Sequence, residues 1–341
     1  GLTQRGWSTD SQFYDLLNQS IFLWIITSLV WLVIRIASFQ GSKIWLIGIS
    51  SIIIFDLFSV NWQLNLYPQL PEWHTQKPAV VAALEADITA QQEQDTLQPF
   101  RVYNEFRLYD NYGIPFGVED MWGASPLRLA YYDQFLQPPM LIERAWAMLN
   151  VKYVITWRDT LYVPSTVLFQ EPAPDGMTYL HRIDATHPRA WLVHDVEQMP
   201  ESMMVSRMAK ADFDPYELVL LPSNVVIDVT PKVGVEQVVI DSMTPTQLIF
   251  DVQVSSSGVL VLSEIDYPGW QAQINGQSTP ILRANSTLRA IPISSGNHQV
   301  VITFQSRSFQ VGAIFSAFTI LGLLIYWVYM WQKRRTTFVT K

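Results

Sequence analysis

Three long apolar runs constrain this chain more than any other feature of its sequence. They cover residues 21–39, 44–60 and 311–331. A helix that crosses a bilayer needs about 20 mostly apolar residues, and these runs are too unbroken for the one-sided stripe of an amphipathic helix. Tryptophans stand near the ends of the runs, as is typical of membrane interfaces. The sequence therefore predicts three transmembrane helices.

Basic residues indicate how these helices are oriented. Lys333, Arg334, Arg335 and Lys341 follow the last run, and short segments rich in Lys and Arg stay in the cytoplasm. Residues 40–43 then form a cytoplasmic turn, and residues 61–308 lie on the extracytoplasmic side. The chain is thus predicted to be a multi-pass protein of the cell membrane with its large domain outside.

The outer segment is acidic and contains no cysteine. It holds 27 Asp and Glu against 15 Lys and Arg, so there is no electrostatic reason to expect nucleic acid as a partner. The absence of cysteine excludes disulfides and thiolate chemistry. The histidines show no metal-type spacing, so no metal or cofactor is predicted. Because the chain starts at Gly1, we expect it to be a processed protein or the C-terminal part of a longer one.

The periodicity of the outer segment changes near residue 222. Before it, helices predicted at 78–94, 126–136, 139–149 and 202–209 alternate with strands at 152–156, 179–183 and 190–194, which favours an α/β layer. Ser125 is the expected cap of the second helix, and Pro126 its first residue. After residue 222, about seven short β-rich runs and the hairpin signal Asn275-Gly276 predict a β-sandwich close to the membrane.

The predicted fold class is therefore a membrane α+β protein. Its parts are an N-terminal segment with two transmembrane helices (1–62), an extracytoplasmic α/β domain (63–222), a membrane-proximal β-sandwich (223–308) and a last transmembrane helix with a basic tail (309–341). Within the sandwich we expect Trp270, Leu288 and Ile291 to be buried and Gln273 and Gln299 to face water. Trp270 has a second interpretation, as a stacking platform for a sugar.

A series of short motifs follows in order through the outer segment. In its second half they are Asp266-Tyr267-Pro268-Gly269-Trp270, Asn275-Gly276, Pro280-Ile281-Leu282-Arg283-Ala284-Asn285, Leu288-Arg289-Ala290-Ile291-Pro292-Ile293 and Gly296-Asn297-His298. In its first half they are Phe100-Arg101-Val102, the segment from Asn111 through Gly113 and Gly117 to Tyr131-Tyr132, Leu149-Asn150-Val151-Lys152-Tyr153-Val154 and Pro188-Arg189-Ala190. Over most of residues 99–331 this series resembles the C-terminal region of the YfhO family of bacterial multi-pass membrane proteins.

The resemblance implies a glycosyltransferase-like protein of the GT-C class. Such proteins use polyprenyl-phosphate-linked sugars to modify cell-envelope glycans or lipids on the outer face. Members of the class have about a dozen spans and usually carry a catalytic carboxylate in the first outer loop, which would precede Gly1. No complete catalytic motif stands in this chain, so the catalytic residues remain unknown and the chain's status as an enzyme stays open.

The segment 107–132 is the richest in side chains that bind sugars. Carboxylates and amides bind sugar hydroxyls, aromatic rings stack on sugar rings, and glycines allow close approach of a ligand. The alternative is a structured loop that only packs on the rest of the domain. The candidate substrate-binding residues are Arg107, Asp110, Asn111, Glu119, Asp120, Trp122, Arg128 and Tyr131.

Two functional hypotheses follow. In the first, this is the substrate-binding or docking region of a GT-C-like membrane glycosyltransferase, with membrane lipid and a polyprenyl-phosphate sugar or envelope glycan as partners. In the second, it is a non-catalytic, membrane-anchored scaffold that joins other membrane subunits into a larger complex. Upstream coding sequence with many more spans favours the first hypothesis, and a start codon near Gly1 favours the second.

Overall fold

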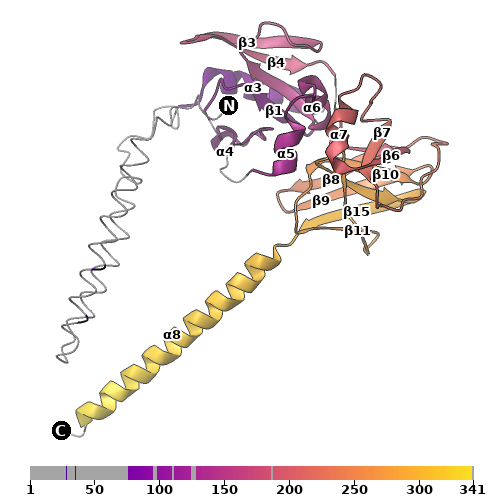
Figure 1. The fold of residues 1–341 in the computed structure, drawn as a ribbon. Helices are drawn as coiled ribbons and strands as arrows, with labels where there is room; N and C mark the ends of the chain where they lie inside the picture. The colour runs from indigo at the N-terminus through magenta and orange to yellow at the C-terminus, as the bar shows by residue number, and fades with distance from the viewer. Residues whose placement is uncertain are drawn as a thin grey trace. The chain divides into compact units, whose positions relative to one another are not determined.

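The computed structural model describes residues 28, 35, 76–94, 98–109, 111–123, 128–185 and 187–339. The chain divides into two units, Gly1–Pro78 and Ala79–Lys341, and Figure 1 labels elements of the second. The spans predicted at 21–39 and 44–60 lie outside the described residues, except for Ser28 and Arg35, which are helical. All that follows concerns the second unit, which is a mixed α+β structure.

The first sheet has four strands in the order β1-β2-β4-β3. Strand β1 (Arg101–Asn104) runs parallel to β2 (Val151–Thr156), while β3 (Ser165–Ala173) and β4 (Gly176–Ile183) form an antiparallel hairpin beside it. Helix α3 (Ala79–Glu93) packs Val80, Val81 and Leu84 into one core with apolar side chains of β2 and β4. The helix at 78–94, predicted from apolar residues that recur on one face, is confirmed.

The two middle helices are shorter than predicted. Helix α5 (Ala130–Phe135) begins after Leu129, which is extended, and the predicted cap at Ser125 lies outside the described residues. Helix α6 (Ile142–Met148) begins after Leu141, which is also extended, rather than at Pro139. Between them the chain turns, with the Met140 amide donating to the Gln137 carbonyl over 3.1 Å. Consecutive prolines at 138 and 139 favour this turn, because the residue before a proline avoids the helical region.

Two antiparallel sheets pack face to face in the C-terminal half. One has the order β13-β14-β10-β5 and the other β12-β11-β15-β9-β8, and apolar side chains of both sheets form one core between them. Leu288 and Ile291 are buried, Trp270 is half-buried, and Gln273 and Gln299 are exposed. The strands are β5 (Ala190–Val193), β8 (Gln237–Thr244), β9 (Gln247–Val254), β10 (Gly258–Ile265), β11 (Trp270–Ile274), β12 (Gln277–Thr279), β13 (Leu282–Ala284), β14 (Leu288–Ile293) and β15 (Gly296–Phe304).

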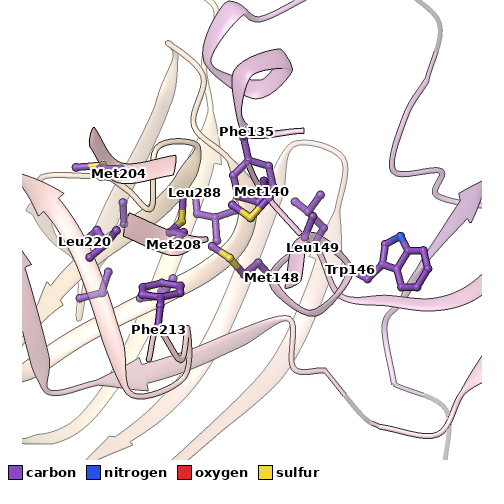
Figure 2. Packing of buried hydrophobic residues seen from close by; sticks show 14 of the residues in the cluster. Phe135, Met140, Trp146, Met148, Leu149, Met204, Met208, Phe213, Leu220 and Leu288 are labelled. Atoms are coloured by element: carbon purple, nitrogen blue, oxygen red, sulfur yellow. The ribbon is translucent and has the colours of Figure 1, made fainter. Parts of the chain in front are cut away.

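Strand β10 is buried on both faces, which explains its unbroken apolar run. Leu260 and Leu262 belong to the core between the two sheets, whereas Val259 and Val261 belong to a second core on the outer side. Figure 2 shows part of that second core, where Met148 from α6 lies close to Leu288 of β14. The sandwich and the segment before it therefore share a core. Strand β5, which precedes the predicted boundary at 222, is itself part of a sandwich sheet, and the domain boundaries stay predictions.

A small parallel pair completes the second core. Strand β6 (Asp195–Met199) pairs with β7 (Leu218–Pro222), and helix α7 (Glu201–Met208) connects them. Met204 and Met208 of α7 are fully buried beside Leu220 of β7 (Figure 2). The helix predicted at 202–209 is confirmed within one residue.

Helix α8 (Arg307–Val339) follows the last strand after only two residues. Its segment Arg307–Val328 has a mean hydropathy of 2.1, and no part of it is buried against the protein. Within the described part of the chain this is the one helix long and apolar enough to cross a membrane. The Ser306 hydroxyl accepts a hydrogen bond from the Phe309 amide at 3.2 Å, a normal helix N-cap. The last predicted span, 311–331, lies within this helix, and the count of three spans stays a prediction.

Candidate functional site

A cluster of arginines and carboxylates, largely buried, joins the first sheet to the sandwich. We call it the arginine cluster. Its members come from segments far apart in the sequence, which the shared core brings together. They are Arg101 of β1, Glu119 before α5, Arg189 before β5, Glu264 of β10 and Arg289 of β14.

Glu264 is the central carboxylate of the arginine cluster. Its Oε1 accepts from Arg189 Nε at 2.7 Å and from Arg101 Nη2 at 3.3 Å. Arg101 Nη1 also donates to the Ser263 carbonyl at 2.7 Å and to the Leu149 carbonyl at 3.0 Å. These bonds compensate the loss of water around Arg101, whose side chain is 12% exposed.

Glu119 extends the cluster toward solvent. Its Oε2 accepts from Arg189 Nη2 at 2.8 Å and lies 3.5 Å from Arg101 Nε. The Glu119 side chain is 48% exposed, whereas that of Arg189 is 4% exposed. Two buried arginines thus share one buried and one exposed carboxylate.

Arg289 stands behind an edge of the sandwich formed by the rings of Trp270, Phe304 and Tyr267, which we call the aromatic edge. Its guanidinium carbon lies 3.9 Å from the centre of the Trp270 ring, close enough for a strong cation–π contact. Its Nε donates to the Ile265 carbonyl at 3.0 Å. Trp270 therefore packs against the sandwich core and a cation. It is half-buried rather than fully buried as predicted, and its role as a platform for a sugar stays a prediction.

Arg283 and Tyr131 form the outer part of this edge. The Arg283 guanidinium carbon lies 4.7 Å from the centre of the Tyr131 ring, and the Tyr131 hydroxyl donates to the Asp266 carbonyl. Arg283 Nη2 donates to both carboxylate oxygens of Glu201, at 2.9 and 2.8 Å. The side chain of Arg283 is 28% exposed, so solvent reaches this arginine.

The charges of these groups perturb one another's pKa values. Burial alone would raise the pKa of Glu264, but the positive charges of Arg101 and Arg189 outweigh it and hold the pKa below its usual range. Burial raises the pKa of Asp266, and the positive charges of Arg283 and Arg289 only partly oppose this. Burial lowers the pKa of Arg289 to about 10, so this side chain is still protonated at neutral pH.

Three guanidinium nitrogens in this region are buried and have no hydrogen-bond partner among the residues that the structure describes. They are Arg189 Nη1, Arg289 Nη1 and Arg283 Nε. A buried donor without an acceptor costs about 1–3 kcal/mol. Guanidinium groups suit anionic ligands with several oxygens, because phosphate and carboxylate match the guanidinium fork.

The aromatic edge lies next to the point where the chain enters α8. The Gln305 amide donates to the Gly269 carbonyl at 2.8 Å. The ring of Phe304, the last residue of β15, is 5.4 Å from that of Trp270 and 6.3 Å from that of Tyr267. Tyr267 is 48% exposed. Aromatic residues beside the end of a membrane-spanning helix are typical of membrane proteins.

Only part of the predicted binding segment reaches this region. Glu119 binds the arginine cluster and Tyr131 packs against Arg283, as described above. The guanidinium carbon of Arg128 lies 5.3 Å from the centre of the Trp122 ring, and Arg128 pairs with Asp133 at 3.2 Å. Asp120 Oδ1 accepts from the Trp122 amide at 2.8 Å, which orders the local turn.

Two other predicted residues lie elsewhere in the unit. Arg107 Nη1 donates to Asp175 at 2.9 Å and its Nε to the Thr178 hydroxyl at 3.0 Å, so this arginine binds the β3–β4 hairpin. Asn111 is an exposed turn residue with a φ of 61°, and Asp110 lies outside the described residues. Whether the predicted residues bind a substrate as a set stays a prediction.

Sequence reasoning missed five of the charged residues now in the site, which are Arg101, Arg189, Glu264, Arg283 and Arg289. A signal for two of them was present. Glu264 follows an unbroken apolar run, and Arg289 stands between Leu288 and Ala290 within a strand. Charged residues are almost never buried unless they are paired, so a charge inside a buried strand predicts a partner. The partner's identity depends on contacts between distant segments.

One family model matches the part of the chain that contains the aromatic edge. Residues 202–316 match the family model of the bacterial membrane protein YfhO. The match begins in α7 and ends in α8, so it includes Glu264, Asp266, Trp270, Arg283 and Arg289. The resemblance to the YfhO C-terminal region is thereby confirmed over these residues, and with it the assignment of the chain to the membrane. No curated protein and no solved structure matches the chain.

Proposed function

We propose that this chain is the substrate-binding or docking region of a GT-C-like membrane glycosyltransferase acting on cell-envelope glycans or lipids. Its domain lies on the extracytoplasmic side and holds the phosphate of a polyprenyl-phosphate sugar at the membrane surface. One observation carries the proposal. The part-exposed Arg283 and the buried Arg289 stand at the aromatic edge that leads within a few residues into the membrane helix.

The geometry of the lipid donor supports this location. A polyprenyl phosphate keeps its tail in the bilayer, so its phosphate lies at headgroup height. Only the membrane-proximal part of the domain can reach it. Gly269 is bonded to Gln305, two residues before α8, which puts Trp270 and its partner Arg289 at that end of the sandwich.

Arg283 is the side chain best suited to meet the phosphate first. It is part-exposed and its present partner, Glu201, is itself 48% exposed, so a phosphate can replace this carboxylate at small cost. Arg289 lies deeper and adds positive charge, and its Nε donates to the Ile265 carbonyl. Arg107, one of the predicted substrate-binding residues, is held by Asp175.

The alternative is a scaffold that joins other membrane subunits. The arginine cluster also fits this role, because Glu264 and Glu119 compensate Arg101 and Arg189 and so connect the first sheet to the sandwich. In a scaffold the arginine cluster makes the domain rigid. Such a protein would not bind a lipid phosphate more tightly than the corresponding uncharged lipid.

The deciding experiment compares a polyprenyl phosphate with the corresponding uncharged polyprenol, using the full chain in lipid nanodiscs. We expect the phosphate form to bind more tightly, and Arg283→Gln to weaken that binding about 10- to 100-fold, as the loss of a charged hydrogen bond predicts. Arg182→Gln is the matched control, because Arg182 is 33% exposed and pairs with Asp87 at 2.7 Å. Equal binding of the two lipids would support the scaffold.

A further inference from the structure

A hollow opens at the end of β2. The function proposed above uses none of the residues that line it. It has a volume of about 440 Å³, within the range of small-molecule sites. Its walls come from the segment after β2 and from β4 of the neighbouring hairpin. The residues that matter for its chemistry are Trp157, Arg158, Asp159, Thr160, Tyr162 and Tyr179.

Two large aromatic side chains are exposed at this hollow. Trp157 is 54% and Tyr162 is 65% exposed. Arg158 lies between them, with its guanidinium carbon 4.4 Å from the Trp157 ring centre and 5.3 Å from that of Tyr162. Two exposed aromatic rings on one surface mark a binding site more often than isolated apolar residues do.

The rings are held in place by buried and part-buried groups. Arg158 donates to both oxygens of Glu105, at 3.0 and 3.2 Å, and to the Tyr162 hydroxyl at 2.9 Å. His181 Nε2 donates to the Arg158 carbonyl at 2.9 Å, and the Thr156 hydroxyl donates to Glu105. A platform fixed in this way loses little conformational entropy when a ligand binds.

The charges of the hollow select among ligands. Glu105 neutralises Arg158, and Asp159 is exposed and forms no ion pair with any residue that the structure describes. A phosphate is therefore repelled by Asp159, and a purely apolar ligand leaves the polar rim without partners. A neutral saccharide fits both features, since one face of a sugar ring carries C–H groups that pack on aromatic rings and its hydroxyls donate to a carboxylate.

We propose that this hollow binds a neutral saccharide, with Trp157 and Tyr162 packing against the sugar ring and Asp159 accepting hydrogen bonds from its hydroxyls. The site is independent of the phosphate site at Arg283. A saccharide bound here is an acceptor glycan or another part of the cell-envelope polymer rather than the lipid phosphate.

Saturation-transfer NMR on the full chain in nanodiscs tests this proposal. The probes are glucose, galactose, N-acetylglucosamine and short neutral oligomers of each, at millimolar concentration. We expect at least one probe to bind, and Trp157→Ala to weaken it about tenfold or more. Asp159→Asn should weaken it several-fold. Met203→Ala, which removes a side chain that is 58% exposed on α7, should have no effect.

The controls keep the two sites separate. Arg283→Gln should leave saccharide binding unchanged, so a failure of the phosphate site does not affect this test. Trp157 is exposed, so its alanine variant should keep the melting temperature of the wild type. The proposal is overturned if no probe binds or if Trp157→Ala binds the probes as the wild type does.

Discussion

Replacing Glu264 by glutamine should destabilise the protein strongly. The substitution keeps the size of the side chain but removes the negative charge that Arg101 and Arg189 share at 3.3 and 2.7 Å. The Glu264 side chain is 15% exposed and that of Arg189 only 4%, so water cannot replace the lost carboxylate. Glu119 is left as the nearest counter-charge for both arginines.

The expected loss follows from what it costs to leave a buried charge without its partner. Removing one member of a buried ion pair costs about 3–5 kcal/mol. For a domain of roughly this size, each kcal/mol lowers the melting temperature by about 2–4 °C. We therefore expect Glu264→Gln to melt about 6–20 °C below the wild type, measured by circular dichroism on the full chain in detergent.

The matched control is Glu197→Gln. Glu197 also accepts from an arginine, Arg207, at 2.8 Å, but its side chain is 39% exposed. An exposed ion pair contributes about 0–1 kcal/mol, so this variant should melt within a few degrees of the wild type. Equal melting temperatures for the two variants would show that the arginine cluster does not hold the first sheet to the sandwich.

Four further predictions follow from the same structure. Because the pKa of Glu264 is lowered in the folded state, its stabilising effect is full above its unfolded pKa and is lost as pH falls. Between neutral pH and about pH 3, the melting temperature of the wild type should therefore fall more steeply than that of Glu264→Gln. Gly113→Ala should lower the melting temperature, because its Cβ would lie 2.2 Å from the Val118 carbonyl oxygen, and an unchanged melt would contradict this. Asn285→Ala should cost about 1–3 kcal/mol in chemical denaturation, because the buried Leu220 amide loses the side-chain oxygen that accepts its hydrogen bond at 2.8 Å. Asn275→Cys, the one thiol in a chain without cysteine, should react with an impermeant reagent in intact cells, and reaction only after lysis would place the domain inside.

Much of the strand and helix pattern could be predicted because it depends on local rules. The hairpin at Asn275-Gly276 is confirmed, with φ values of 51° and 80° that suit a type I′ turn. Strand β3 was missed, since it has no buried residue and carries Glu171 and Pro172 near its end. Thr166, Val167 and Phe169 favour a strand, but no apolar alternation marks one. Its place is decided by pairing with β4, which is a contact that sequence periodicity does not contain.

The candidate site was harder to predict than the fold. Glu119 and Tyr131 were selected because their types bind sugars, yet their observed roles depend on Arg189 and Arg283, which are 70 and 152 residues away in the sequence. Arg107 shows the same limit, because its partner Asp175 belongs to a hairpin that was not predicted as a whole. Residue type indicates which chemistry is possible, and long-range packing decides where it is located.

The most direct test of the proposed function is to locate the lipid phosphate on the protein. The measurement is photo-crosslinking of the full chain in nanodiscs with a polyprenyl phosphate that carries a diazirine beside its phosphate, followed by mass spectrometry of the labelled peptides. We predict label on the Asp266–Trp270 turn and on the strand that carries Arg283, reduced in Arg283→Gln and unchanged in Arg182→Gln. Label confined to α8, or to the β3–β4 hairpin around Arg107, would contradict the proposal.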